Sequence, residues 1–81
     1  MDWEKHITID PKIQHGRPVI RGTRMPVEYV LGSLAGGMSF ADIQRAYEIT
    51  EDGIQAAILF AKDLIEQGQF HPLPTQKKFF A

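Results

Sequence analysis

Three arginines lie close together in the segment from Gly16 to Pro26, which reads Gly-Arg-Pro-Val-Ile-Arg-Gly-Thr-Arg-Met-Pro. A guanidinium group presents a rigid fork of donors that suits phosphates and carboxylates. The spacing of Arg17, Arg21 and Arg24 lets a twisted, extended segment show at least two of them on one surface. The glycines and prolines between them favour a specific backbone shape. The segment therefore indicates an anion-binding surface.

Other residue patterns give little support for catalysis or for a metal site. The chain of 81 residues has no cysteine, and it contains no Gly-x-Ser-x-Gly elbow and no Walker loop. Its three histidines do not have the spacing of metal ligands, such as His-x-x-x-His. We expect His6 on the polar face of a strand, His15 in a turn and His71 beside a proline, all at the surface. The sequence predicts a protein that is not an enzyme and holds neither cofactor nor metal.

Length and composition predict one small domain that gains stability by association. A single core in a domain of this size supplies only about 3–5 kcal/mol, and a chain without cysteine has no disulfide to add. Oligomerisation is the remaining source of stability. The N-terminus lacks the apolar run of a secretory signal, and no stretch is long enough to span a membrane. We therefore expect a cytoplasmic protein.

The formal net charge of −1 hides a segregation of charge along the chain. Residues 1–26 contain five Lys and Arg against three acids, residues 27–68 two against seven, and residues 69–81 two against none. A protein that coats nucleic acid uniformly would be more basic. The segregation suggests that different faces meet different partners.

The elements that position the arginines begin with two short predicted strands. Apolar and polar residues alternate over residues 3–10, with Trp3, Ile7 and Ile9 on one face. Val19–Ile20 forms the second strand. Two such strands are marginal alone, so they need helices or the same strands of a second subunit.

Three helices are predicted after the strands. The first has Pro26 at its first position and ends at residues 36–37, both glycine. The second spans Ser39–Tyr47 and the third about Glu51–Gln67, followed by the stop residue Gly68. The second and third each follow a hydroxyl N-cap, with the spacing of a hydrophobic staple. The predicted core stripe of the third helix is Ile54, Ala57, Ile58, Ala61, Leu64 and Ile65.

The third helix also carries apolar residues off that stripe. Leu59 lies roughly opposite it and Phe60 lies at its edge, an arrangement more typical of a helix or subunit contact than of a ligand pocket. The residues predicted to form a dimer interface are Trp3, Ile7, Ile9, Leu59 and Phe60.

The second and third helices, joined by residues 48–50, have the tight connection of a helix-turn-helix. Two packed helices of a small bundle explain the pattern equally well. The third helix opens with Glu51 and Asp52, which DNA phosphates would repel. One or two arginines are alternatively expected to pair with Glu28, Glu51 or Asp52 within the fold. The residues predicted to contact DNA are Arg17, Arg21, Arg24, Arg45, Thr50 and Gln55.

The block from Gly16 to Val27, together with Leu-Ala-Gly-Gly-Met-Ser at residues 34–39, resembles the bacterial family called domain of unknown function 433. The resemblance covers about residues 5–68, including the helix that ends at Tyr47 and the segment Ile54–Ile58. It implies a homeodomain-like helix-turn-helix with a small N-terminal sheet, commonly dimeric. It also implies an antitoxin role in a module whose toxin is a PIN-like nuclease, and it transfers no catalytic motif.

Residues 69–81 lie beyond that block and are predicted to form an extended tail. In an antitoxin such a tail would lie across the nuclease, with its aromatic side chains in pockets and a lysine on active-site carboxylates. A frayed terminus is the alternative. The predicted partner-binding residues are Phe70, Leu73, Lys77, Lys78, Phe79 and Phe80.

The sequence thus predicts a mainly α, homeodomain-like three-helix domain over residues 1–68, with a short N-terminal β-hairpin or dimer sheet. We expect a homodimeric, antitoxin-like transcriptional autoregulator that binds DNA. Two alternatives stay open. One is an interaction module that neutralises a PIN-like nuclease without reading DNA, and the other is an orphan structural dimer.

Overall fold

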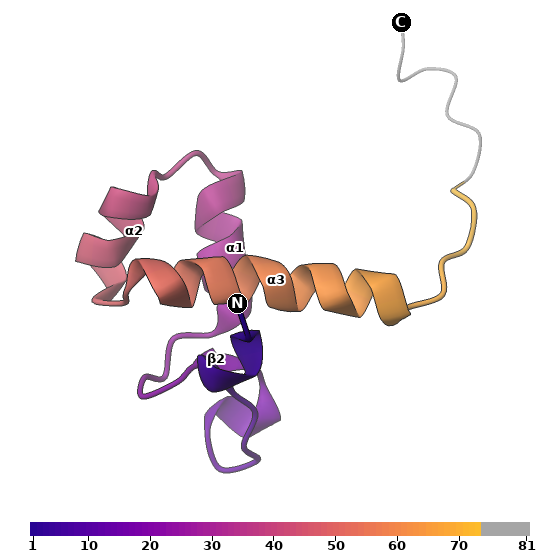
Figure 1. The fold of residues 1–81 in the computed structure, drawn as a ribbon, viewed down its shortest axis with the longest axis horizontal. Coiled ribbons are helices and arrows are strands. Elements are labelled where there is room, and N and C mark those ends of the chain that lie inside the picture. The colour runs from indigo at the N-terminus through magenta and orange to yellow at the C-terminus, as the bar shows by residue number, and fades with distance from the viewer. Residues whose placement is uncertain (74–81) are drawn as a thin grey trace, which may run out of the picture.

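Three helices pack beside a two-stranded antiparallel sheet in the computed structural model, which describes residues 1–73 (Figure 1). This arrangement confirms the predicted mainly helical fold with an N-terminal hairpin. The elements in chain order are η1 (Trp3–Lys5), β1 (Ile7–Thr8), η2 (Gln14–Gly16), β2 (Val19–Ile20), α1 (Val27–Ala35), α2 (Phe40–Tyr47) and α3 (Glu51–Gln67). No helix in residues 1–73 is both long and apolar enough to cross a membrane.

The sheet is shorter than the alternation over residues 3–10 predicted. Strands β1 and β2 pair only through Ile7 with Ile20 and Thr8 with Val19, while η1 forms a 3-10 turn instead of a strand. Ile9 is exposed. The turn has a tertiary cause: it brings the indole of Trp3 against α3, where Nε1 donates to Asp63 Oδ2 at 2.6 Å. A contact with a residue this distant in sequence is invisible to local alternation.

The helix ends follow their local sequence. Ser39 Oγ accepts a hydrogen bond from the backbone N–H of Asp42, and Thr50 Oγ1 accepts one from Gly53, both at 3.1 Å. These contacts confirm the two predicted hydroxyl N-caps. Pro26 is itself an N-cap with an extended backbone and not the first helical residue as predicted, so α1 starts one residue later. Helix α2 ends at Tyr47, and its C-cap Glu48 has a left-handed φ of 56°.

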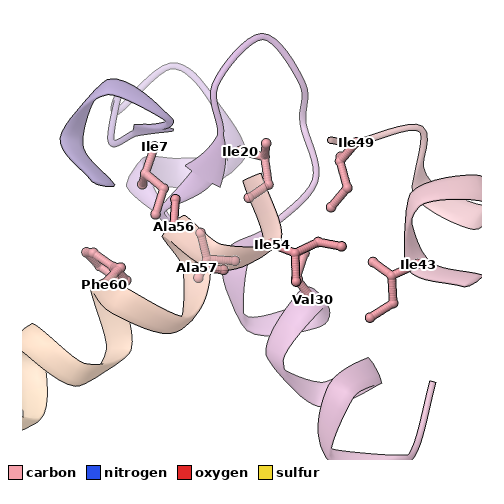
Figure 2. Close-up of a cluster of buried hydrophobic side chains, with 10 residues drawn as sticks. Ile7, Ile20, Val30, Ile43, Ile49, Ile54, Ala56, Ala57 and Phe60 are labelled. Carbon is pink, nitrogen blue, oxygen red and sulfur yellow. The ribbon is translucent and has the colours of Figure 1, made fainter. Parts of the chain in front are cut away.

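The hydrophobic core joins the sheet to all three helices (Figure 2). Its fully buried side chains include Ile43 on α2, Ile54 on α3, and Val27 and Val30 on α1. Helix α3 faces the core through Gly53, Ile54, Ala56, Ala57 and Phe60.

The predicted core stripe of α3 is wrong in its C-terminal half. Ile58, Leu64 and Ile65 are 41, 53 and 61% exposed, whereas Ala56 and Phe60, outside the predicted stripe, are buried. The reason is geometric: the body of the domain covers only the first part of the helix, and the last turns extend past it (Figure 1). Periodicity identifies an apolar face but does not say how much of it the rest of the chain can reach.

Candidate nucleic-acid interface

Arg21 uses its guanidinium group to hold the N-terminal segment in place. Its Nε donates to the carbonyl of Lys5 at 2.9 Å, and its Nη2 donates to those of Glu4 and Ile7 at 3.0 and 3.4 Å. Its backbone N–H also donates to the carbonyl of His6. A fork directed at three backbone carbonyls is a structural clamp. Arg21, one of the four arginines predicted to contact DNA, therefore has its guanidinium engaged within the fold.

Arg17 and Arg45 have acidic partners on the surface. Arg17 Nη1 lies 3.1 Å from Glu28 Oε1, with both side chains more than half exposed, as the sequence allowed for one of the arginines. Arg45 pairs with Asp42 one turn earlier on α2. Exposed pairs of this kind contribute only about 0–1 kcal/mol. Either arginine can therefore exchange its carboxylate for a phosphate at small cost.

Arg24 is the arginine that the fold leaves available. Its side chain is exposed, and within residues 1–73 no hydrogen bond or ion pair engages it. The turn that carries it is nonetheless fixed. Thr23 Oγ1 donates to the carbonyl of Ile20 at 2.7 Å and accepts from the N–H of Met25 at 3.0 Å, and Gly22 has a φ of 80°. The fixed turn holds the backbone of Arg24 in place, so that only its side chain has to become ordered when it binds an anion.

The turn that carries Arg24 begins beside the first turn of α3. A Cβ placed on Gly53 would lie 3.3 Å from Ile20 Cγ2, which is tighter than ordinary van der Waals contact. Figure 2 shows Ile20 next to the start of α3, on the side of the core formed by the sheet. Glycine at position 53 thus lets β2, and the basic turn that follows it, approach the start of the helix.

The start of α3 itself presents mixed chemistry. The Thr50 hydroxyl is engaged as the helix cap, whereas Gln55 is exposed with its amide available to a ligand. Glu51 and Asp52, which lie between these two residues in the chain, are exposed in the first turn of α3. Their negative charges interact favourably with the helix dipole and repel phosphate.

The predicted dimer residues divide into two groups. Ile7 and Phe60 are only 4 and 7% exposed, and the Trp3 ring packs edge-on against Phe60 with centroids 4.8 Å apart. Ile7 and Phe60 thus belong to the core of one chain and have little surface to offer a second subunit, whereas Trp3 is half-buried beside that core. Ile9 is exposed and Leu59 half-buried.

The predicted partner-binding residues lie at the end of the described chain or beyond it. Phe70 and Leu73 are 69 and 87% exposed. Lys77, Lys78, Phe79 and Phe80 lie outside the described residues. In the part of the chain that the structure describes, no cluster of three His, Cys, Asp or Glu side chains can hold a metal, and no cavity is found.

Comparison with known proteins places these features in a family. The family model described as "Protein of unknown function (DUF433)" matches residues 7–61, which span the sheet and most of the helical region. The X-ray crystal structure of Rv2018 from Mycobacterium tuberculosis is similar, with 31% sequence identity and a TM-score of 0.61. The match covers 68% of this chain and 26% of that one, so this chain spans about a quarter of the solved protein's length. No curated protein matches. The chain belongs to the DUF433 family.

Proposed function

We propose that this chain is an antitoxin-like, DNA-binding transcriptional autoregulator. The basic turn after β2 and the α2–α3 pair form the DNA-facing surface. Arg24 is its leading phosphate ligand, and Arg17 and Arg45 contribute once they leave their acidic partners. Gln55 is the side chain on α3 best suited to a base edge. A regulator of this kind acts in the cytoplasm.

The contact between Ile20 and Gly53 carries this proposal. A helix-turn-helix reads DNA with the start of its second helix, and the flanking segments hold the phosphates. Here a Cβ on Gly53 would lie 3.3 Å from Ile20 Cγ2, so the start of α3 packs closely against β2, and the turn that carries Arg24 follows that strand directly. The exposed Arg24, which has no hydrogen bond or ion pair within residues 1–73, supports a phosphate contact from the turn after β2.

The charge distribution determines how strong the binding can be. Three arginine–phosphate contacts predict a slope of about −2 to −3 in a plot of log affinity against log salt concentration. Glu51 and Asp52 oppose contacts deep in the groove, so binding rests on the few flanking arginines. We expect modest affinity that falls visibly with salt.

The test is a fluorescence-anisotropy titration of the full chain with DNA from upstream of its own gene, using an unrelated duplex as the control. The informative variant is Arg24→Gln, matched by Lys12→Gln. Lys12 is also exposed, but lies in the connection from β1 to β2, at the opposite end of β2 from the turn. Loss of binding and a shallower salt slope for Arg24→Gln alone would support the interface. Equal binding to both duplexes would refute sequence-selective regulation.

A second candidate function is neutralisation of a PIN-like nuclease without DNA reading. The high exposure of Phe70 and Leu73, which directly follow α3, favours it. Two large, highly exposed apolar side chains only three residues apart in the chain are typical of a protein contact. Deletion of residues 69–81 would then abolish capture of a nuclease encoded beside this gene. Full capture by the shortened chain would exclude this segment.

A further inference from the structure

We propose that a second copy of this chain packs against the exposed apolar face of α3, antiparallel and helix to helix. This face, the α3 stripe, consists of Ile58, Ala61, Leu64 and Ile65. The resulting dimer contact differs from the one predicted from the N-terminal strands.

The α3 stripe lies where the domain leaves its longest helix uncovered. The last buried residue of α3 is Phe60, yet the helix continues to Gln67 and extends beyond the body of the domain (Figure 1). Ile58, Leu64 and Ile65 are each at least 41% exposed on that part of the helix. Apolar side chains grouped on one helix face, rather than scattered singly, mark a surface that another element covers.

The spacing of the α3 stripe suits a second copy of the same helix. Ile58 stands three residues before Ala61, and Leu64 stands three residues after it. When two such helices run antiparallel about a two-fold axis at Ala61, each Ile58 lies against the Leu64 of the other copy. An isologous interface requires this self-complementarity. The small side chain of Ala61 at the crossing point allows the helices to approach to about 8 Å.

The charges that flank the α3 stripe are compensated within one chain. Lys62 Nζ lies 2.6 Å from Glu66 Oε1, and this hydrogen bond raises the pKa of Lys62 above its usual value. Asp63, on the far side of the helix, accepts the hydrogen bond from Trp3. A second copy therefore meets no uncompensated charge of its own sign beside the stripe. Nucleic acid would find no cationic surface there.

The size of the α3 stripe sets the expected strength of the dimer. Four side chains per copy offer less than the roughly 800 Å² per partner of a standard stable interface. A contact below that size belongs to the weak, transient class of interfaces. The dimer should therefore dissociate on dilution.

Sedimentation equilibrium of the full chain, from about 1 to 100 μM, tests the proposal. We expect a concentration-dependent dimer, and Ile65→Glu should raise its dissociation constant at least about tenfold. Ile9→Glu is the matched control, since Ile9 is 57% exposed on the surface next to β1. A chain that stays monomeric throughout would overturn the proposal. So would a dimer that Ile9→Glu disrupts and Ile65→Glu does not.

Crosslinking gives an independent readout of the axis, because the natural chain has no cysteine. Oxidised Ala61→Cys should form a disulfide-linked dimer, since two cysteines at the crossing point come within bonding distance. Ala46→Cys, an exposed alanine on α2, should not. Equal crosslinking of both variants would overturn the axis at Ala61. A chain that stays monomeric over that whole concentration range but still binds operator DNA would refute this inference while leaving the DNA-binding proposal intact.

Discussion

Trp3 and Asp63, sixty residues apart in the chain, are joined by a hydrogen bond of 2.6 Å from the indole Nε1 to the carboxylate Oδ2. Around this bond the Trp3 ring packs edge-on against Phe60. The two contacts fasten the N-terminal segment across the middle of α3. They explain why a segment with a strand-like sequence pattern folds as a 3-10 turn.

Removing the acceptor at position 63 should loosen this fastening. Asp63→Ala leaves the half-buried indole N–H without its partner and should lower the free energy of unfolding by about 1–2 kcal/mol. Asp63→Asn keeps an acceptor oxygen and should cost under about 0.5 kcal/mol. Urea unfolding followed by circular dichroism gives both values. Equal losses for the two variants would mean that the carboxylate charge, and not the hydrogen bond, matters.

Substitutions of Arg21 and Arg24 should affect stability differently, because Arg21 has a structural role and we propose Arg24 as a ligand-facing residue. Arg21→Gln removes a clamp on three backbone carbonyls and should destabilise the fold by about 1–3 kcal/mol. Arg24→Gln should change stability by less than about 0.5 kcal/mol, because its side chain is exposed and makes no hydrogen bond or ion pair in the described chain. Denaturant midpoints measured under the same conditions compare the two directly. A large loss of stability for Arg24→Gln would contradict its assignment as a ligand-facing residue.

The parts of the fold that the sequence predicts well are those determined locally. The caps at Ser39 and Thr50 follow from a hydroxyl residue and the three positions after it, and both are formed. The parts that it predicts poorly depend on distant contacts. Trp3 packs against α3 instead of lying in a strand. Its ring covers Phe60, which is buried in the core.

The candidate site shows the same division. The arginine-rich segment was evident from composition, but which arginine is available depends on partners that no local pattern reveals. Only the fold shows Arg21 bound to carbonyls of residues 4, 5 and 7. The role of Gly53 was missed because its lack of a side chain matters only opposite Ile20. The sequence did contain one signal for this role. Gly53 stands at the third position of a predicted helix, where the capping pattern favours Glu.

A glycine at position 15, in the connection between the two strands, should stabilise the fold. His15 has a φ of 57° and follows Gln14, whose φ is 49°. A left-handed backbone costs a residue with a Cβ roughly 1–2 kcal/mol, which glycine avoids. Glycine loses more conformational entropy on folding, and this loss offsets part of the gain. His15→Gly should therefore raise the free energy of unfolding by up to about 1 kcal/mol, whereas His15→Ala keeps the strain. Thermal unfolding of the pair tests this, and a less stable glycine variant would show that the imidazole makes a stabilising contact.

Enlarging Gly53 should connect the packing of the fold to its proposed function. In Gly53→Ala the new methyl group meets Ile20 Cγ2 at 3.3 Å, while the gain in helix propensity is about 1 kcal/mol. These effects nearly cancel, so Ala should change stability by less than about 1 kcal/mol. Gly53→Val adds two further methyl groups that β2 cannot accommodate without moving, and should destabilise the fold by about 1–3 kcal/mol.

The displacement in Gly53→Val should also move the Arg24 turn away from the start of α3. DNA affinity should then fall under conditions in which the variant is still fully folded, even though every arginine remains. The measurement is the anisotropy titration, performed beside a circular dichroism spectrum at the same temperature. If a folded Gly53→Val chain binds DNA as tightly as the natural one, the turn and the helix do not act as one surface. The arginines would then have to bind DNA independently of α3.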